Sequence, residues 1–227
     1  MTRAFDAVSL DVGGVLVVPD HGTLAGALSR AGVTYDLSRF GIGHYLAMAA
    51  MDGARSGAEV FTDYVGGFAA AVGVPEADQP TAHDALLSVL FTPVWCQPVP
   101  GSRAALRALV DAGLRLAVTS NSDGTVADHL RRHEWLQVGE GPGVPVEIVT
   151  DSGAIGVAKP DPRLFQATID GLGLLSERIL HIGDAVRYDV EGAAAVGMLS
   201  VHMDPFDVCR STDHDHVRSL ADLLDLL

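Results

Sequence analysis

An aspartate that directly follows a short apolar run is the residue best placed for chemistry in this sequence. The run Ala7–Leu10 ends in Asp11, and a Gly13-Gly14 turn comes shortly after it. A buried strand ending in a carboxylate presents it at the sheet edge where α/β proteins bind ligands, and such a carboxylate can act as a nucleophile. Asp6 precedes the same run, so it would lie at the opposite edge. We therefore take Asp11 as the candidate nucleophile.

Three further polar signals follow apolar runs later in the chain. They are Thr119-Ser120-Asn121, the segment Gly156–Pro160 with Lys159, and Gly183-Asp184 with Asp189. Taken singly, each has an ordinary structural explanation, because Asp, Ser and Asn cap helices and a loop lysine is commonly solvated. Their position after successive strands is informative, since the carboxyl ends of parallel strands meet at one edge of a sheet.

Four apolar runs, and the helical patterns between them, predict an α/β fold. The runs are Ala7–Leu10, Leu114–Thr119, Val146–Val149 and Ile179–Ile182. Segments such as Ser102–Ala112 and Pro162–Leu172 have helical patterns. Alternating strands and helices indicate βαβ units. We therefore expect a Rossmann-like parallel sheet flanked by helices on both faces.

The stretch from Gly22 to Leu90 has a different pattern. It is rich in alanine, and its candidate helices are Leu37–Ala50, Ala58–Ala71 and Ala82–Leu90, with no strand predicted. Connections between strands in compact domains are usually far shorter. We therefore predict an α-helical cap inserted after the first strand, with the core at 1–18 and 94–227 and the cap at 19–93. The alternative is that these helices pack on the sheet as part of one domain.

With these motifs in this order, the chain resembles a haloacid dehalogenase-superfamily hydrolase of the phosphatase-like branch. That family has a nucleophilic aspartate after the first strand, a serine or threonine after the second, a lysine further on, and a final Gly-Asp with a second aspartate nearby. The matching residues here are Asp11, Ser120, Lys159, Asp184 and Asp189. The resemblance covers essentially the whole chain, including a helical cap. It implies a phosphatase that acts on a small phosphorylated metabolite.

The resemblance also implies a role for each matched residue. Asp11 would attack phosphorus and form an aspartyl-phosphate. Lys159 would pair with the phosphate and the nucleophile, while Ser120 and Asn121 would bind the transferring group. A carboxylate that attacks a dianionic phosphate needs its charge neutralised, which Mg²⁺ does. The implied Mg²⁺ ligands are Asp11, the backbone carbonyl of Gly13, Asp184 and Asp189.

Gly13 departs from the family pattern, which usually has a second aspartate there as general acid and base. Such catalysis contributes roughly 10²–10⁴-fold. Either Asp20, His21 or a cap residue substitutes, or the leaving group needs little help, or turnover is slow or absent. Two alternatives to the phosphatase therefore stay open. One is a 2-haloacid dehalogenase, in which the aspartate attacks carbon without a metal and an aromatic residue is typical where Gly13 stands; the other is a non-catalytic phosphate-binding or interaction protein.

Composition limits the classes of partner. The 227 residues are 48% hydrophobic and 19% charged, which is typical of a globular protein. The net charge of −14 makes nucleic acid and anionic membranes poor partners. No uncharged run reaches the roughly 18 residues of a membrane span, and the first residues contain no apolar signal region. The two cysteines, Cys96 and Cys209, form no disulfide framework, so we expect a cytoplasmic protein.

Two weaker signals concern possible ligands. Asp213–His216, near His202, contains metal-binding residue types, but such clusters in polar loops are usually solvated, and we expect no site there. In the predicted cap, His44, Tyr45 and Arg55 would either contact the leaving group or lie on a solvated face.

Overall fold

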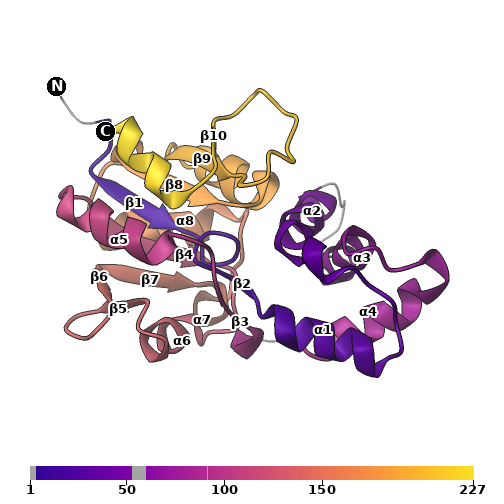
Figure 1. The fold of residues 1–227 in the computed structure, drawn as a ribbon. Helices are drawn as coiled ribbons and strands as arrows, with labels where there is room; N and C mark the ends of the chain where they lie inside the picture. Colours follow the sequence, from indigo (N-terminus) through magenta and orange to yellow (C-terminus); the bar gives the residue numbers. More distant parts are fainter. Residues whose placement is uncertain (1–3, 53–59, 91) are drawn as a thin grey trace.

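Six parallel strands form the main sheet, in the order β10-β9-β8-β1-β4-β7 (Figure 1). The computed structural model of the protein describes residues 4–52, 60–90 and 92–227. The strands are β1 (Ala7–Leu10), β4 (Arg115–Ser120), β7 (Ile148–Asp151), β8 (Ile179–Gly183), β9 (Leu199–Met203) and β10 (His216–Val217). The predicted α/β fold with a parallel sheet is therefore confirmed.

Strand β1 lies in the middle of the sheet, and all four of its residues are buried. Helices cover both faces, so the strand must be apolar throughout. Val8 and Leu10 belong to the core that includes Leu106 of α5 (Ser102–Asp111), whereas Ala7 packs on the opposite face in the core of α8 (Pro162–Leu172). The further helical elements of the core are α6 (Val126–Arg132), α7 (Ser152–Ile155), η4 (Ser176–Arg178), η5 (Val186–Glu191), α9 (Gly192–Ala194) and η6 (Leu220–Leu226).

The predicted strand at Val146–Val149 is two strands in the structure. Val146 ends β6 (Val144–Val146), which pairs with β5 (Leu136–Val138), while β7 begins at Ile148 and joins the main sheet. Glu147 lies between them, and its N–H donates to the carbonyl of Leu116 on β4 at 2.9 Å while its carboxylate pairs with Arg115. The apolar run therefore contained the boundary between two sheets.

A helical part lies beside the sheet and has a hydrophobic core of its own (Figure 1). The two chain segments that connect it to the sheet, β2 (Val17–Pro19) and β3 (Trp95–Pro98), pair with each other in antiparallel fashion. The separate core supports an inserted cap, and its boundaries at 19 and 93 stay a prediction. The helical elements are α1 (His21–Arg30), η1 (Leu37–Arg39), α2 (Phe40–Asp52), α3 (Val60–Ala71), η2 (Glu76–Asp78), α4 (Gln79–Leu87) and η3 (Thr92–Val94).

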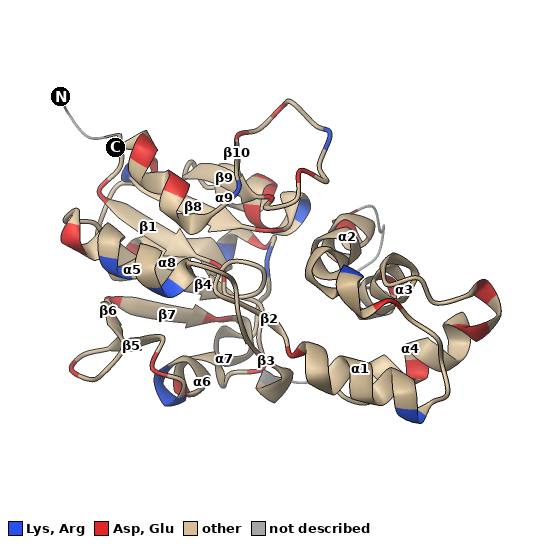
Figure 2. Cartoon of the chain, in the orientation of Figure 1, with Lys and Arg blue, Asp and Glu red and all other residues tan. Residues whose placement is uncertain are grey.

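Acidic segments occur on both the sheet part and the helical part (Figure 2). Basic segments are scattered between them rather than gathered on one element in this view, in keeping with 29 acidic against 15 basic residues. Within the described ranges, every helix is too short or too polar to cross a bilayer.

Candidate active site

The carboxyl ends of β1, β4 and β8 meet at one point because of the register of the sheet. Leu10 is paired with Val118 on one side and with Ile182 on the other. Asp11 comes next, and its N–H donates to the carbonyl of Ile182 at 2.9 Å. Ser120 and Asp184, which end or follow the neighbouring strands, are buried with it. The structure thus brings the predicted strand-end residues to one edge of the sheet.

A buried lysine lies between two of the carboxylates. Nζ of Lys159 is 2.8 Å from Oδ1 of Asp11 and 2.5 Å from Oδ1 of Asp189, and the Lys159 side chain is 2% exposed. Asp11, Asp184 and Asp189 each have a carboxylate oxygen within 4.8 Å of the others. Lys159 is the only lysine in the chain. An ammonium suits this place because it is a compact charge, whereas a guanidinium is a wide planar fork.

The pKa values of Asp11, Asp189 and Lys159 are shifted in different directions by their surroundings. Burial raises the pKa of Asp11 to about 7, although Lys159 works in the opposite direction. Burial also opposes ionisation of Asp189, but Lys159 and His181 hold the pKa of Asp189 well below its usual range. Burial would lower the pKa of Lys159, but Asp11 and Asp189 raise it above its usual value. Lys159 and Asp189 therefore form the ionised pair, and Asp11 is the carboxyl that takes up a proton near neutral pH.

The oxygen atoms of the carboxylates are of the kind that binds a divalent cation. Oδ1 of Asp184 is buried and has no hydrogen-bond partner among the described residues. Leaving such an oxygen unsatisfied is costly, and a cation beside it would remove the cost. The carbonyl of Gly13 accepts from the N–H of Val15 at 2.7 Å and keeps a second lone pair. The residues present therefore fit a cation that prefers oxygen ligands.

Glycine is required in the turn after Asp11 for a steric reason. Gly14 has φ +64°, and a Cβ built on it would lie 1.9 Å from Oδ2 of Asp184. A Cβ on Gly183 would lie 2.0 Å from Cγ of Asp189. The carboxylates of Asp184 and Asp189 thus pass directly over backbone that has no side chain.

We expect Gly14→Ala to displace Asp184 and to weaken divalent cation binding at least about 10-fold. The matched control is Gly32→Ala, since Gly32 has φ +72° but open space around its Cβ position. The control should cost only the left-handed strain of about 1–2 kcal/mol. Calorimetric cation titration and urea unfolding of both variants measure the two effects. Equal losses in the two variants would show that backbone strain, and not the contact with Asp184, accounts for the glycine.

Two residues, Asn121 and His181, support the charged side chains of the site. The side chain of Asn121 accepts from the N–H of Lys159 at 2.7 Å and donates to its carbonyl at 3.2 Å, so it holds the lysine loop. His181 was missed, because a histidine inside an apolar strand gives no signal in the sequence. Its Nε2 lies 3.1 Å from Asp189 and its Nδ1 3.0 Å from Oγ of Ser9, which fixes the Asp189 carboxylate from below.

Helix α2 of the helical part closes over the site. Nε2 of His44 donates to Oδ2 of Asp184 at 2.7 Å, and Tyr45 donates to the carbonyl of Gly14 at 2.8 Å. Asp52 accepts from the N–H groups of Val186 and Arg187 at 2.7 and 3.0 Å. His44 and Tyr45 therefore contact the site rather than solvent, whereas the predicted Arg55 and the start of the predicted helix Ala58–Ala71 lie outside the described residues.

The other two candidates for the missing acid have structural partners. Oδ1 of Asp20 accepts from the N–H and hydroxyl of Thr23 at 2.8 and 2.7 Å and so caps α1. His21 lies 3.1 Å from the side-chain amide of Gln97. Of Asp20, His21 and His44, the last is the one that contacts a carboxylate of the site.

A cavity of about 160 Å³ adjoins Asp184. Tyr45 and Asp52 of α2 line one side of it, and His202 and Asp204 line the other. The cavity therefore lies between the helical part and the loops at the carboxyl edge of the sheet.

These features are those of an α/β protein with a buried carboxylate at the end of its central strand and a helical insertion over that strand end. The chain belongs to the haloacid dehalogenase-like hydrolase family, whose family model matches residues 5–197.

Curated relatives and solved structures agree with this family. "Haloacid dehalogenase-like hydrolase domain-containing protein 3" of Mus musculus is 33% identical over 162 residues, which cover 68% of this chain and 62% of that protein. A phosphoserine phosphatase of Thermus thermophilus is 35% identical over 105 residues, 46% of this chain and 40% of that enzyme. The chain thus spans less than two thirds of the length of these relatives.

Among solved structures, the putative HAD-hydrolase YfnB from Bacillus subtilis, bound to magnesium, matches with a TM-score of 0.67 at 17% identity, covering 100% of this chain and 99% of that one. A solved dehalogenase matches with a TM-score of 0.61 at 18% identity, covering 100% and 99%. Because both identities are low, the fold alone does not separate the two chemistries.

Proposed function

We propose that the protein is a Mg²⁺-dependent phosphatase that hydrolyses a small phosphorylated metabolite through an aspartyl-phosphate on Asp11. The observation that carries the proposal is the set of three buried carboxylates, two of which pair with Lys159 and the third of which, Asp184, has an unsatisfied oxygen. Three acidic groups against one ammonium leave negative charge that a divalent cation would balance. The phosphatase named among the relatives supports the same reaction type.

Each residue has a defined part in this reaction. Asp11 attacks phosphorus in line with the leaving oxygen, the ester P–O bond breaks, and the leaving alkoxide departs as the alcohol with a proton from water. A second water then attacks the phosphorus of the aspartyl-phosphate, which releases phosphate and restores Asp11. Lys159, which already contacts Asp11, would balance charge on the equatorial oxygens. Ser120 would donate its hydroxyl to the transferring group. Asn121 would act through its backbone N–H, since its side chain is bound to the Lys159 backbone.

The residues that would hold the Mg²⁺ are Asp11, the carbonyl of Gly13, Asp184 and Asp189. When bound, the cation supplies a positive charge that neutralises the phosphate and favours ionised Asp11. This matters because burial raises the pKa of Asp11 to about 7 in the chain without a cation, and only the carboxylate is a nucleophile.

A cavity lies beside Asp184, on the side of that residue that faces α2. Its volume of about 160 Å³ corresponds to roughly five water molecules at about 30 Å³ each. We infer that the leaving group extends past Asp184 into this space, which would suit a small metabolite. A cytoplasmic location stays a prediction.

The carboxylate set favours phosphatase over dehalogenase chemistry. Attack of Asp11 on carbon needs no cation, so Asp184 would then be a buried acid with an unsatisfied oxygen and no function. A phosphate dianion is repelled by the carboxylates of Asp11 and Asp189, so its binding beside them requires a cation.

Removal of Mg²⁺ is expected to lower phosphate release from an activated aryl phosphate at least about 10²-fold, because charge stabilisation by the cation is worth several kcal/mol. The measurement is a Mg²⁺ titration of protein dialysed against EDTA, with halide release from a 2-haloacid followed in parallel. Halide release that persists in EDTA would contradict the phosphatase proposal and support the dehalogenase alternative. Binding of a beryllium–fluoride complex with Mg²⁺, without turnover of any phosphate ester, would favour the non-catalytic alternative.

Gly13→Asp tests the missing acid. A Cβ at Gly13 would lie 3.2 Å from Cζ3 of Trp95 and 3.9 Å from Oδ2 of Asp11, so the side chain fits once the indole shifts slightly. We expect turnover of alkyl phosphates, which leave poorly, to rise by up to about 10²-fold, with little change for aryl phosphates. Gly13→Asn is the control of equal size without an acid. An equal or negative effect of Gly13→Asp on both substrates would mean that another group already supplies the proton.

A further inference from the structure

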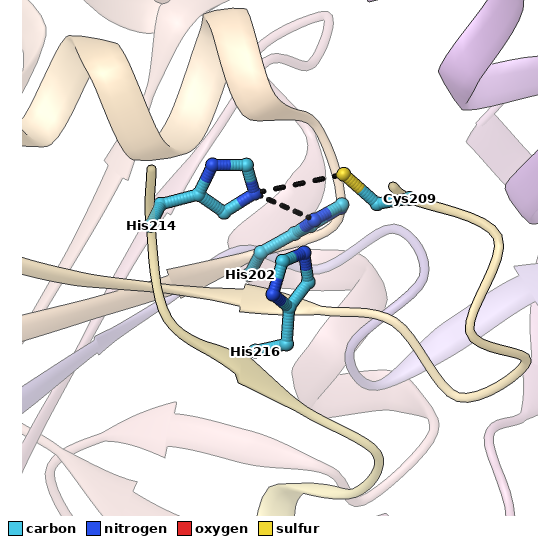
Figure 3. A group of neighbouring side chains, drawn as sticks. All are labelled: His202, Cys209, His214 and His216. Carbon is cyan, nitrogen blue, oxygen red and sulfur yellow. Dashed lines mark hydrogen bonds between the residues drawn. The ribbon is translucent and has the colours of Figure 1, made fainter. Parts of the chain in front are cut away.

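Three histidines and a cysteine lie close together on β9, β10 and the loop between these strands. One ligand atom of each lies within 4.8 Å of those of the others, and Figure 3 shows the four side chains pointing toward one another. Two of them are paired neighbours on β9 and β10, and the other two come from the loop between these strands. All lie beyond residues 5–197, which the family model matches. The four are His202, Cys209, His214 and His216.

Hydrogen bonds fix which nitrogens of two histidines face the group. Nε2 of His202 lies 3.2 Å from the carbonyl oxygen of Asp184, and Nδ1 of His214 lies 2.7 Å from Oδ1 of Asp213. A carbonyl or carboxylate oxygen only accepts, so these two nitrogens carry the hydrogens. The remaining nitrogens, Nδ1 of His202 and Nε2 of His214, then face each other with lone pairs at 3.3 Å. Such an arrangement is stable when a cation lies between them.

The spacings agree with tetrahedral zinc. With Zn–N near 2.0–2.1 Å and Zn–S near 2.3 Å, two nitrogen ligands lie about 3.3 Å apart and a sulfur and a nitrogen about 3.6 Å apart. The two nitrogens here are 3.3 Å apart, and Sγ of Cys209 is 3.7 Å from Nε2 of His214. A lone proton between the histidines would not account for the thiol and the third imidazole in the same group.

The surroundings of these four residues bury two of the histidines and orient the side chains. His202 on β9 is 5% exposed and the side chain of His214 is 7% exposed, so the expectation that the segment Asp213–His216 is solvated was wrong for His214. The carboxylate of Asp213 behind His214 is an arrangement that orients metal-binding imidazoles. Asp204 accepts from the N–H of Cys209 at 2.8 Å and positions the cysteine.

We propose that His202, Cys209, His214 and His216 bind a Zn²⁺ ion that fixes the loop between β9 and β10. Imidazole and thiolate ligands select zinc over Mg²⁺, whereas the carboxylates of the active site select the reverse. The zinc would also hold His202 against the carbonyl of Asp184, which connects this loop to the active-site edge of the sheet.

Cobalt substitution in excess Mg²⁺ tests the proposal. The full chain is expected to bind Co²⁺ with the strong visible absorption of a tetrahedral ion and a thiolate-to-cobalt charge-transfer band. Cys209→Ser should abolish the charge-transfer band and weaken binding by more than about 10²-fold. Cys96→Ser, at the other free cysteine, should leave the spectrum and the affinity unchanged.

Two further variants keep the test decisive if Cys209→Ser fails to fold. His216 is exposed, so His216→Asn should fold and still weaken Co²⁺ binding at least about 10-fold, while Asp213→Asn should weaken it about 10–100-fold. Zinc measured in protein purified without added metal should approach about one ion per chain. A wild-type cobalt complex without the thiolate band, or an affinity that none of these variants changes, would overturn the proposal in favour of loose binding by surface histidines.

Discussion

Asp11→Asn is expected to lower phosphate release at least about 10³-fold, with the fold retained. An amide of the same shape cannot attack phosphorus, and loss of a nucleophile commonly costs this much or more. The variant keeps an oxygen that can accept from Lys159, which lies 2.8 Å from Asp11. Steady-state kinetics with an activated aryl phosphate, together with circular dichroism, measure both parts of the prediction.

Asp6→Asn is the matched control for the nucleophile. Asp6 lies at the opposite end of the same strand and pairs with Arg178 at 2.8 Å, so its loss should change turnover less than about 2-fold and stability by less than about 1 kcal/mol. If Asp11→Asn retained more than a tenth of the activity while Asp6→Asn lost it, Asp11 would not be the nucleophile.

Asp11→Asn should also change how the stability of the protein depends on pH in the absence of Mg²⁺. Burial raises the pKa of Asp11 from 3.8 to about 7, so the folded state binds a proton that the unfolded state has released between these values. The contribution of this group to stability is therefore present below about pH 4 and is lost as the pH rises through about 7. Asparagine stays neutral, so Tm of Asp11→Asn relative to wild type should rise between about pH 4 and about pH 7. A difference in Tm that is independent of pH would contradict this account of Asp11.

Lys159→Met is expected to lower turnover about 10³-fold and the free energy of unfolding by about 3–5 kcal/mol. Lys159 is 2% exposed and contacts both Asp11 and Asp189, so its removal leaves two buried acids facing each other. Mg²⁺ should restore part of the lost stability, because the cation would replace the missing charge. Urea unfolding with and without Mg²⁺, and steady-state kinetics, give the measurements.

Two variants separate charge from shape at this position. Lys159→Arg keeps the charge but places a planar fork between the carboxylates, so it should retain more stability than Lys159→Met and still lose turnover. Arg163→Met breaks an exposed pair with Asp161 and should cost less than about 1 kcal/mol. A Lys159→Met variant with near wild-type stability and activity would mean that Asp11 and Asp189 do not need the ammonium.

The part of the site that could be predicted from the sequence is the part made by parallel strands. Strand β1 and helix α8 have the predicted limits, because a fully buried strand and an amphipathic helix leave unambiguous patterns. Once the strands are known to be parallel, Asp11, Ser120 and Asp184 must share an edge, whatever the details of packing.

The contacts that could not be predicted join residues distant in sequence through packing alone. His44 and Asp184 are 140 positions apart, and nothing in the helical pattern of α2 indicates which side chain faces the sheet. Strand β9 was missed because Ser200 and His202 interrupt its apolar residues. Without β9 and its neighbour β10, His202 and His216 could not be recognised as paired.

Lys159 carries the only ε-amine in the 227 residues of the sequence. Reagents that acylate ε-amines therefore have one target in this sequence. The enclosed ammonium, whose pKa is raised by Asp11 and Asp189 after the opposing effect of burial, should react slowly until the site opens. The extent of acylation of this single side chain over time, measured by mass spectrometry, would report how often the site around it opens, without any engineered label.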